Sequence, residues 1–197
     1  MAKWSWSAAV SGGDLLNLAA FAKSVREAGG AALHVDAADG RLVPGFGIGT
    51  DVARALAGAQ SLPVDLHLLA EDADGGVNAL LVLGCASVML HVECLTHAHR
   101  ALALIRETGI SAGIAINPAT PLTALEHLLN SVDRILLLAT EPGTTPQALP
   151  PAAFERVKIV RENVDYHDRK IQVEVEGVTV PRDCAQLIGH GADRIVL

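Results

Sequence analysis

Aromatic residues, positive charge, paired cysteines and long apolar runs are all scarce in this sequence. Only 3% of its 197 residues are aromatic although 50% are hydrophobic, so Ala, Val, Leu and Ile must build the core. Such a composition favours helices packed against buried parallel strands, which read as continuous aliphatic runs. It disfavours an antiparallel β-sandwich, whose strands alternate more strictly and carry more aromatic residues.

The charge and the lack of long apolar runs exclude two classes of partner. The formal net charge is -7, and no stripe of Lys and Arg is present to neutralise nucleic-acid phosphates. No apolar run approaches the roughly 20 residues that cross a bilayer. The N-terminal segment MAKWSWSAAV is too short in its apolar part for a secretory signal. We therefore expect a cytoplasmic protein that binds neither nucleic acid nor membrane.

The cysteines also point to a reducing compartment. Cys85, Cys94 and Cys184 are odd in number and have neither metal-like spacing nor an even disulfide framework. We interpret them as small buried hydrophobic residues.

Short aliphatic runs alternate with amphipathic stretches along the chain. Helices are predicted over residues 14–29, 96–109 and 121–132, the last with Thr120 as its cap and Pro121 in its first turn. The predicted strands lie near residues 4–9, 31–36, 62–68, 86–92, 112–116, 133–139, 171–176 and 193–197.

Several of these strands directly follow a glycine, as after Gly84 and Gly191, which is typical of the helix-to-strand connection in parallel α/β proteins. Eight such units predict a (β/α)8 TIM barrel formed by a single domain over residues 1–197. A Rossmann fold is disfavoured because the first strand is followed by no dinucleotide-binding glycine pattern. The sequence stops with strand eight, so the eighth helix is missing from it. Either the chain is shortened or a partner covers that flank.

Ionisable and amide side chains gather at the ends of the predicted strands, where TIM barrels carry their functional groups. They are His34, Asp36, Asp65, His67, His91, Glu93, Asn117, Glu174 and Glu176. The other histidines lie in helical stretches, near helix ends or in loops and are interpreted as surface or packing residues. They are His97, His99, His127, His167 and His190.

Alternation along a strand places His34 and Asp36 on one side, facing His67 of the next strand. Glu174 and Glu176 likewise share one side of the seventh strand. Two imidazoles with two carboxylates suit Zn²⁺, Fe²⁺ or Mn²⁺. A single histidine at a strand end is more often a satisfied core residue. Several histidines on successive strands, each beside a carboxylate, favour a metal site, because burying so many ionisable groups without partners is costly.

The stretch from His34 to Pro44 resembles the His-x-Asp-x-Met-Asp-Gly-x-Phe-Val-Pro signature of the ribulose-phosphate 3-epimerase family. Further segments match that family in order and spacing, so the resemblance covers nearly the whole chain from Ser7 to Leu197. They are Asp65–Leu69, His91–Glu93, Ile116–Pro121, Glu141–Gly143 and Glu174–Gly177.

This resemblance implies an isomerase that inverts C3 of a ketose phosphate, of the D-ribulose 5-phosphate and D-xylulose 5-phosphate type. It implies one divalent ion per chain, Zn, Fe, Mn or Co, held by His34, Asp36, His67 and Glu176. Asp36 and Glu176 would exchange the C3 proton on opposite faces of the sugar, as inversion requires. The family also commonly forms homo-oligomers.

The resemblance further implies which residues contact the substrate. At the first strand Ser7 and Ser11 are both possible, because the local alignment slips by about two residues, comparable to the usual uncertainty of element boundaries. The candidate contacts are Ser7, His67, Asn117, Gly143 and Gly177.

The departures from the family pattern cluster around the substrate. Glu176 replaces an Asp, which moves the carboxylate by about 1.5 Å, and a shift of that order can cost about 100-fold in rate. The phosphate loop reads Gly143 to Gln147, and Pro146 in it has no N–H to donate. Ala38, Leu69 and Leu138 replace methionines, Val178 replaces a glycine, and the family's Gly-Ser after strand eight lies beyond Leu197.

These observations support two hypotheses. The favoured one is an active metal-dependent epimerase, which rests on His34, Asp36 and His67. The alternative is a non-catalytic or substrate-shifted barrel that acts as a binding module, which rests on Glu176, Ala38 and the altered loop.

Overall fold

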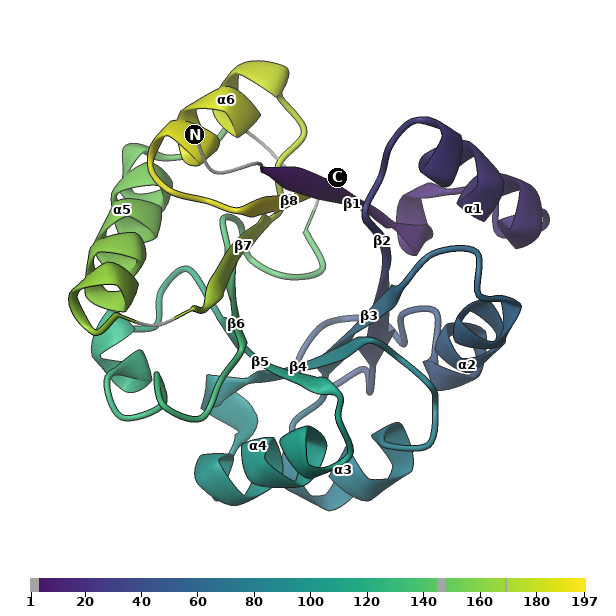
Figure 1. Ribbon diagram of the computed structural model, residues 1–197, viewed down its shortest axis with the longest axis horizontal. Coiled ribbons are helices and arrows are strands. Elements are labelled where there is room, and N and C mark those ends of the chain that lie inside the picture. The colour runs from purple at the N-terminus through teal and green to yellow at the C-terminus, as the bar shows by residue number, and fades with distance from the viewer. Residues whose placement is uncertain (1–3, 145–147, 169) are drawn as a thin grey trace.

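The computed structural model describes residues 4–144, 148–168 and 170–197. Eight parallel strands form a closed barrel in chain order, and the eighth pairs with the first (Figure 1). The strands are β1 (Ser5–Ala9), β2 (Ala32–Ala38), β3 (Val64–Leu69), β4 (Ser87–His91), β5 (Ser111–Ile116), β6 (Arg134–Leu138), β7 (Gln172–Glu176) and β8 (Arg194–Val196). The predicted TIM barrel is therefore confirmed.

The helices lie outside the ring of strands (Figure 1). They are α1 (Leu18–Glu27), α2 (Thr50–Ala59), α3 (Ala73–Leu80), α4 (Ala98–Glu107), α5 (Pro151–Tyr166) and α6 (Pro181–Gly189), with short 3-10 helices η1 (Val10–Gly12), η2 (Val92–Cys94) and η3 (Leu122–Leu125). Within the described ranges, none of them combines the length and the hydropathy that a membrane crossing needs.

The main hydrophobic core lies between the strands and the helices. Outward-facing residues of neighbouring strands, such as Leu33, Leu66 and Ile114, are fully buried there. A smaller apolar layer fills the barrel interior around Met89 and Leu136. Because both faces of each strand are covered, the strands read as the aliphatic runs from which they were predicted.

One predicted helix is wrong. Residues 121–132 form η3 and a series of turns, with i→i+3 hydrogen bonds such as Leu128 N to the carbonyl of Leu125. The expected cap is absent among the described contacts, because the Thr120 hydroxyl instead donates to Glu93 Oε1 at 2.5 Å. Leu125 and Leu128 are still buried. The amphipathic spacing therefore predicted correctly which side chains are buried, but it predicted the wrong backbone conformation.

The glycines before the strands adopt the conformation that the prediction required. Gly84 and Gly191 have φ of 77° and 107°, a region that residues with a Cβ rarely occupy. The three cysteines are free thiols; Cys85 is buried as predicted, whereas Cys94 and Cys184 are partly exposed.

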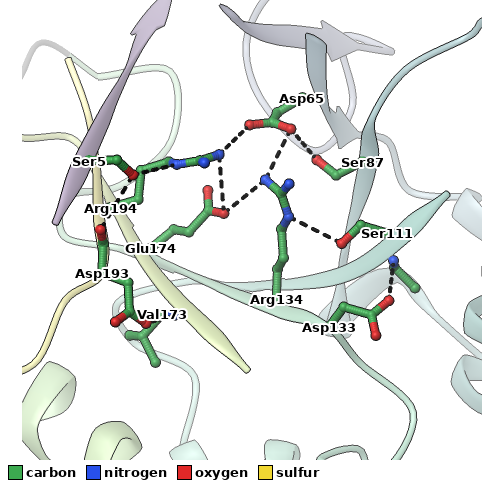
Figure 2. Close-up of polar contacts among 11 residues, drawn as sticks. Ser5, Asp65, Ser87, Ser111, Asp133, Arg134, Val173, Glu174, Asp193 and Arg194 are labelled. Atoms are coloured by element: carbon green, nitrogen blue, oxygen red, sulfur yellow. Dashed lines mark hydrogen bonds and ion pairs between the residues drawn. The ribbon is translucent and has the colours of Figure 1, made fainter. Parts of the chain in front are cut away.

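Four charged side chains form the closed-end cluster, which we define as Asp65, Arg134, Glu174 and Arg194, inside the barrel at the amino ends of the strands (Figure 2). Arg134 Nη1 lies 3.0 Å from Asp65 Oδ1 and 3.1 Å from Glu174 Oε1. Arg194 Nη1 lies 2.7 Å from Asp65 Oδ2 and 3.8 Å from Glu174 Oε1. Each guanidinium thus contacts both carboxylates.

Serines at strand starts complete this cluster. Ser87 Oγ donates to Asp65 at 2.6 Å, while Arg134 Nε donates to Ser111 Oγ and Arg194 Nε to Ser5 Oγ, both at 3.1 Å (Figure 2). The buried charges are therefore paired within the protein, as stable burial requires.

Candidate metal centre and active site

Two imidazoles and two carboxylates meet inside the barrel at the carboxyl ends of the strands. We call His34, Asp36, His67 and Glu176 the open-end cluster. They come from β2, β3 and β7, and one ligand atom from each lies within 4.8 Å of all the others. The register pairs Asp36 with His67 directly, as the alternation of side chains predicted.

Both carboxylates approach both imidazoles. Asp36 Oδ1 lies 3.2 Å from His34 Nε2 and 3.1 Å from His67 Nδ1. Glu176 Oε2 lies 3.4 Å and 3.2 Å from the same two nitrogens. The four atoms therefore surround one common point, which is the arrangement of a tetradentate site.

The electrostatics of this cluster show a deficit of positive charge. Burial alone would lower the pKa of His34, but the attraction of Asp36 and Glu176 outweighs burial and raises that pKa well above its usual range. The pKa of His67 is raised by the same balance. Burial raises the pKa of each carboxyl, yet the imidazoles lower that of Asp36 and bring that of Glu176 to about 2. The carboxylates thus draw protons onto the imidazoles.

The donor set fits a divalent cation. Three buried atoms of the cluster make no hydrogen bond to any described residue. They are the two ring nitrogens of His34 and Glu176 Oε2. Buried polar atoms without partners are rare in native proteins. Two nitrogens and two oxygens suit Zn²⁺, Fe²⁺, Mn²⁺ or Co²⁺, so a cation can take the place that extra protons would otherwise fill.

A cavity of about 360 Å³ opens over the cluster. Asp36 and Glu176 line it with side chains 17% and 22% exposed, whereas both imidazoles are fully buried beneath. Gly143 and Gly177 line its wall. A molecule in this cavity would therefore meet the carboxylates first and the imidazoles only through a bound cation.

The comparisons with known proteins agree with this geometry. A model of the ribulose-phosphate 3 epimerase family matches residues 7–197. The chain belongs to this family. The family resemblance seen in the sequence is thereby confirmed, and with it the prediction of an enzyme similar to the ribulose-phosphate 3-epimerases, which are isomerases.

Relatives within the ribulose-phosphate 3-epimerase family match over most of their length. The ribulose-phosphate 3-epimerase of Serratia marcescens is 32% identical over 100% of this chain and 94% of its own. That of Bacillus subtilis is 31% identical over 88% of this chain and 81% of its own. Among solved structures, a mutant tryptophan synthase α-subunit from Pyrococcus furiosus aligns with a TM-score of 0.71 over 100% of this chain and 86% of its own. At 17% identity, that likeness shows the barrel fold alone.

The predicted substrate contacts of this epimerase-family chain lie in different surroundings. Gly143 and Gly177 line the cavity. Ser7 is fully buried in the middle of β1, while Ser11, its alternative, lines the cavity. Asn117 lies after β5, and its N–H donates to Glu93 Oε1 at 2.8 Å. In the altered phosphate loop, Thr145, Pro146 and Gln147 lie outside the described residues.

The alternation of β7 could not separate its two carboxylates. Both point into the barrel, but Glu174 pairs with arginines in the closed-end cluster and only Glu176 reaches the imidazoles. Burial raises the pKa of Glu174 despite those arginines.

His91 and Glu93 were not predicted as site residues, although both lie at a strand end. His91 Nε2 lies 2.9 Å from His67 Nε2, and His91 Nδ1 lies 3.1 Å from Glu93 Oε2. The available signal was the two-residue spacing from His91, the last residue of β4, to Glu93 in η2, which repeats the His-x-Asp spacing of β2.

Proposed function

We propose that this chain is a metal-dependent epimerase that inverts C3 of a ketose phosphate, of the D-ribulose 5-phosphate and D-xylulose 5-phosphate type. One observation carries the proposal: Asp36 and Glu176 both line the cavity while sharing the same two buried imidazoles. The names of the relatives supply the substrate class, a sugar phosphate.

Inversion of a carbon needs a proton to leave one face and another to arrive at the opposite face. In this proposal Asp36 and Glu176 fill these two roles, one as base and the other as acid, and they exchange roles in the reverse direction. The carboxyl that acts as base must be ionised, and the imidazoles favour that state by lowering the pKa values of both carboxyls. The carboxyl that acts as acid must carry the proton that it donates.

His34, Asp36, His67 and Glu176 would hold the cation, one ion per chain. A divalent cation there supplies stabilisation of the negative charge that develops on a substrate oxygen when the neighbouring C–H bond breaks. The buried imidazoles of His34 and His67 would bind the cation on the side facing away from the cavity. Ser11, Gly143 and Gly177 would contact the sugar phosphate at the cavity wall, and Ser7 and Asn117 remain predicted contacts.

A binding module without turnover is the second candidate. It is favoured by the longer side chain of Glu176 and by Ala38, which leaves open space at the cavity wall. Such a protein would bind the cation and the sugar phosphate without moving the proton.

Two measurements on purified protein test the proposal together. Elemental analysis should find one divalent ion per chain, and NMR in D₂O should show exchange of the C3 proton of D-ribulose 5-phosphate. His34→Asn should lose both the ion and the exchange. The same change at the exposed His127 is the matched control and should lose neither.

A metal-loaded protein without exchange would support the binding module or a shifted substrate. A metal-free, inactive protein would overturn the proposed site altogether. Light scattering after gel filtration would test the further proposals that residues 1–197 form one folded domain and that this domain self-associates.

A further inference from the structure

A chain of hydrogen-bonding side chains leads away from the metal site through His67. His67 directs Nδ1 toward Asp36 at 3.1 Å and Nε2 toward His91 Nε2 at 2.9 Å. His91 is fully buried on β4, and its Nδ1 lies 3.1 Å from Glu93 Oε2. His67 Nε2 and both ring nitrogens of His91 therefore each face one defined partner, whereas His67 Nδ1 faces both carboxylates of the open-end cluster.

A cation bound at His67 fixes where the protons of the chain must lie. Its Nδ1 ligand atom must be unprotonated, so the neutral ring carries its proton on Nε2 and donates to His91. His91 Nε2 must then accept, which leaves the proton of His91 on Nδ1. Glu93 is the acceptor for that proton, and an ionised carboxylate can only accept. Of the two tautomers open to neutral His91, Glu93 thus permits the one that the metal site needs.

The Glu93 carboxylate is itself held in one orientation. Its Oε1 accepts from the N–H of Asn117 at 2.8 Å and from the hydroxyl of Thr120 at 2.5 Å. Arg156 binds the carbonyls of the same loop, at 2.9 Å for Thr120 and 3.0 Å for Asn117. Burial acts against ionisation, but these donors and His91 bring the pKa of Glu93 to about 2.

We propose that Glu93 is a positioning residue that acts through His91 to fix the tautomer of His67, and thereby sets how tightly the open-end cluster binds its cation. The inference rests on the proposed metal site and extends it to residues outside the cavity. Partners of this kind behind a metal-bound histidine typically contribute about 10- to 100-fold in metal affinity.

Glu93→Gln tests this mechanism directly. If the side-chain carbonyl of the introduced glutamine keeps the two donors of Asn117 and Thr120, its NH₂ group faces His91 Nδ1 and requires that nitrogen to accept. The proton of His91 then moves to Nε2 and faces His67. That places the proton of His67 on Nδ1, where it competes with the cation.

The experiment measures Zn²⁺ affinity by competition with a chromophoric chelator. Wild type should bind one ion, E93Q should bind it about 10- to 100-fold more weakly, and E126Q, the same change at an exposed position, should match wild type. In the H91Q background, E93Q should lose its effect, because a glutamine at that position has no ring tautomer to select. Long-range ¹H–¹⁵N NMR of the metal-free protein should find the His91 proton on Nδ1 in wild type and on Nε2 in E93Q.

The outcomes separate the two proposals. A wild type that binds no Zn²⁺ overturns the metal site and this inference with it. A wild type that binds Zn²⁺ while E93Q binds equally well, or with His91 in an unchanged tautomer, overturns the inference alone. If E93Q weakens Zn²⁺ binding equally in the wild-type and H91Q backgrounds, the inference is also overturned, because the effect would then be a general structural one. If H91Q does not fold, the NMR comparison of wild type with E93Q decides.

Discussion

Two polar clusters occupy the same barrel interior, and they solve the problem of buried charge differently. The closed-end cluster sets two arginines against its two carboxylates, so it neutralises itself (Figure 2). The open-end cluster sets two imidazoles against its two carboxylates. Neutral imidazoles leave those carboxylates without compensation, and the raised pKa values of His34 and His67 are the result.

This comparison shows why only one cluster is a candidate site. Glu174 and Glu176 stand on one strand and face the same interior, so position alone does not separate them. The difference is the neighbouring cation: Arg134 contacts Glu174, whereas Glu176 meets nitrogens that can also bind a metal. The arginine contacts of Glu174 give it a structural role, whereas the histidines around Glu176 make it a candidate metal ligand.

The largest effect should follow from breaking the open-end cluster. Asp36→Asn keeps the size of the side chain and removes its capacity to accept the C3 proton. Proton exchange should fall by about 10²- to 10⁴-fold. Exchange is measured by NMR in D₂O, and the unfolding midpoint is recorded alongside. D51N, at an exposed position of α2, is the control; an active D36N with bound metal would show that another residue is the base.

Breaking the closed-end cluster should instead cost stability. Arg134→Met leaves Asp65 and Glu174 buried with a single guanidinium. Removing one partner of a buried ion pair costs about 3–5 kcal/mol in the free energy of unfolding, measured here by denaturant titration. Metal content should stay at one ion per folded chain. R100M, an exposed change on α4, gives the baseline, and an equal cost in both variants would contradict the structural role.

Much of this contrast was predictable from the sequence, and the reasons are physical. Strands buried on both faces read as aliphatic runs, so their limits were predicted to within about two residues, as is usual for element boundaries. The alternation of β2 placed His34 and Asp36 together. Two things were not predictable. Glu176 could not be told from Glu174 without knowing where Arg134 and Arg194 point. The chain from His91 to Glu93 depends on how neighbouring strands align.

The pH dependence of metal binding sharpens the comparison, because only the open-end cluster should respond to metal. The lowered pKa values of Asp36 and Glu176 stabilise the metal-free fold at every pH above the usual pKa values of these carboxyls. This stabilisation is lost as the pH falls through their lowered pKa values. The raised pKa values of His34 and His67 stabilise the metal-free fold fully below pH 6.5. This stabilisation is lost as the pH rises through the raised pKa values of the two imidazoles. The metal-free cluster is therefore most stabilising between 4.5 and 6.5.

A metal ion needs neutral imidazoles, so it competes with protons in that window. At free metal about 100-fold above Kd, the gain in unfolding free energy is about 2.7 kcal/mol. At a fixed metal concentration this gain should be larger at pH 8 than at pH 6, as thermal unfolding with and without Zn²⁺ would show. R134M should show the same metal-induced gain. A gain that does not change with pH would mean that the imidazoles are not ligands.

The smallest effect concerns geometry within the open-end cluster. The family pattern has Asp where this chain has Glu176, and the extra methylene shifts the carboxylate by about 1.5 Å. If that shift limits turnover, Glu176→Asp should raise the exchange rate by about 10-fold, within the roughly 100-fold that such a displacement can cost. The rate of C3 proton exchange and the Zn²⁺ affinity are measured together. Faster exchange at unchanged affinity assigns the gain to proton transfer, because Asp36 and both imidazoles still hold the ion. Slower exchange would show that the cavity has adapted to Glu176, since Ala38 of β2, which also lines the cavity, leaves room for a displaced substrate.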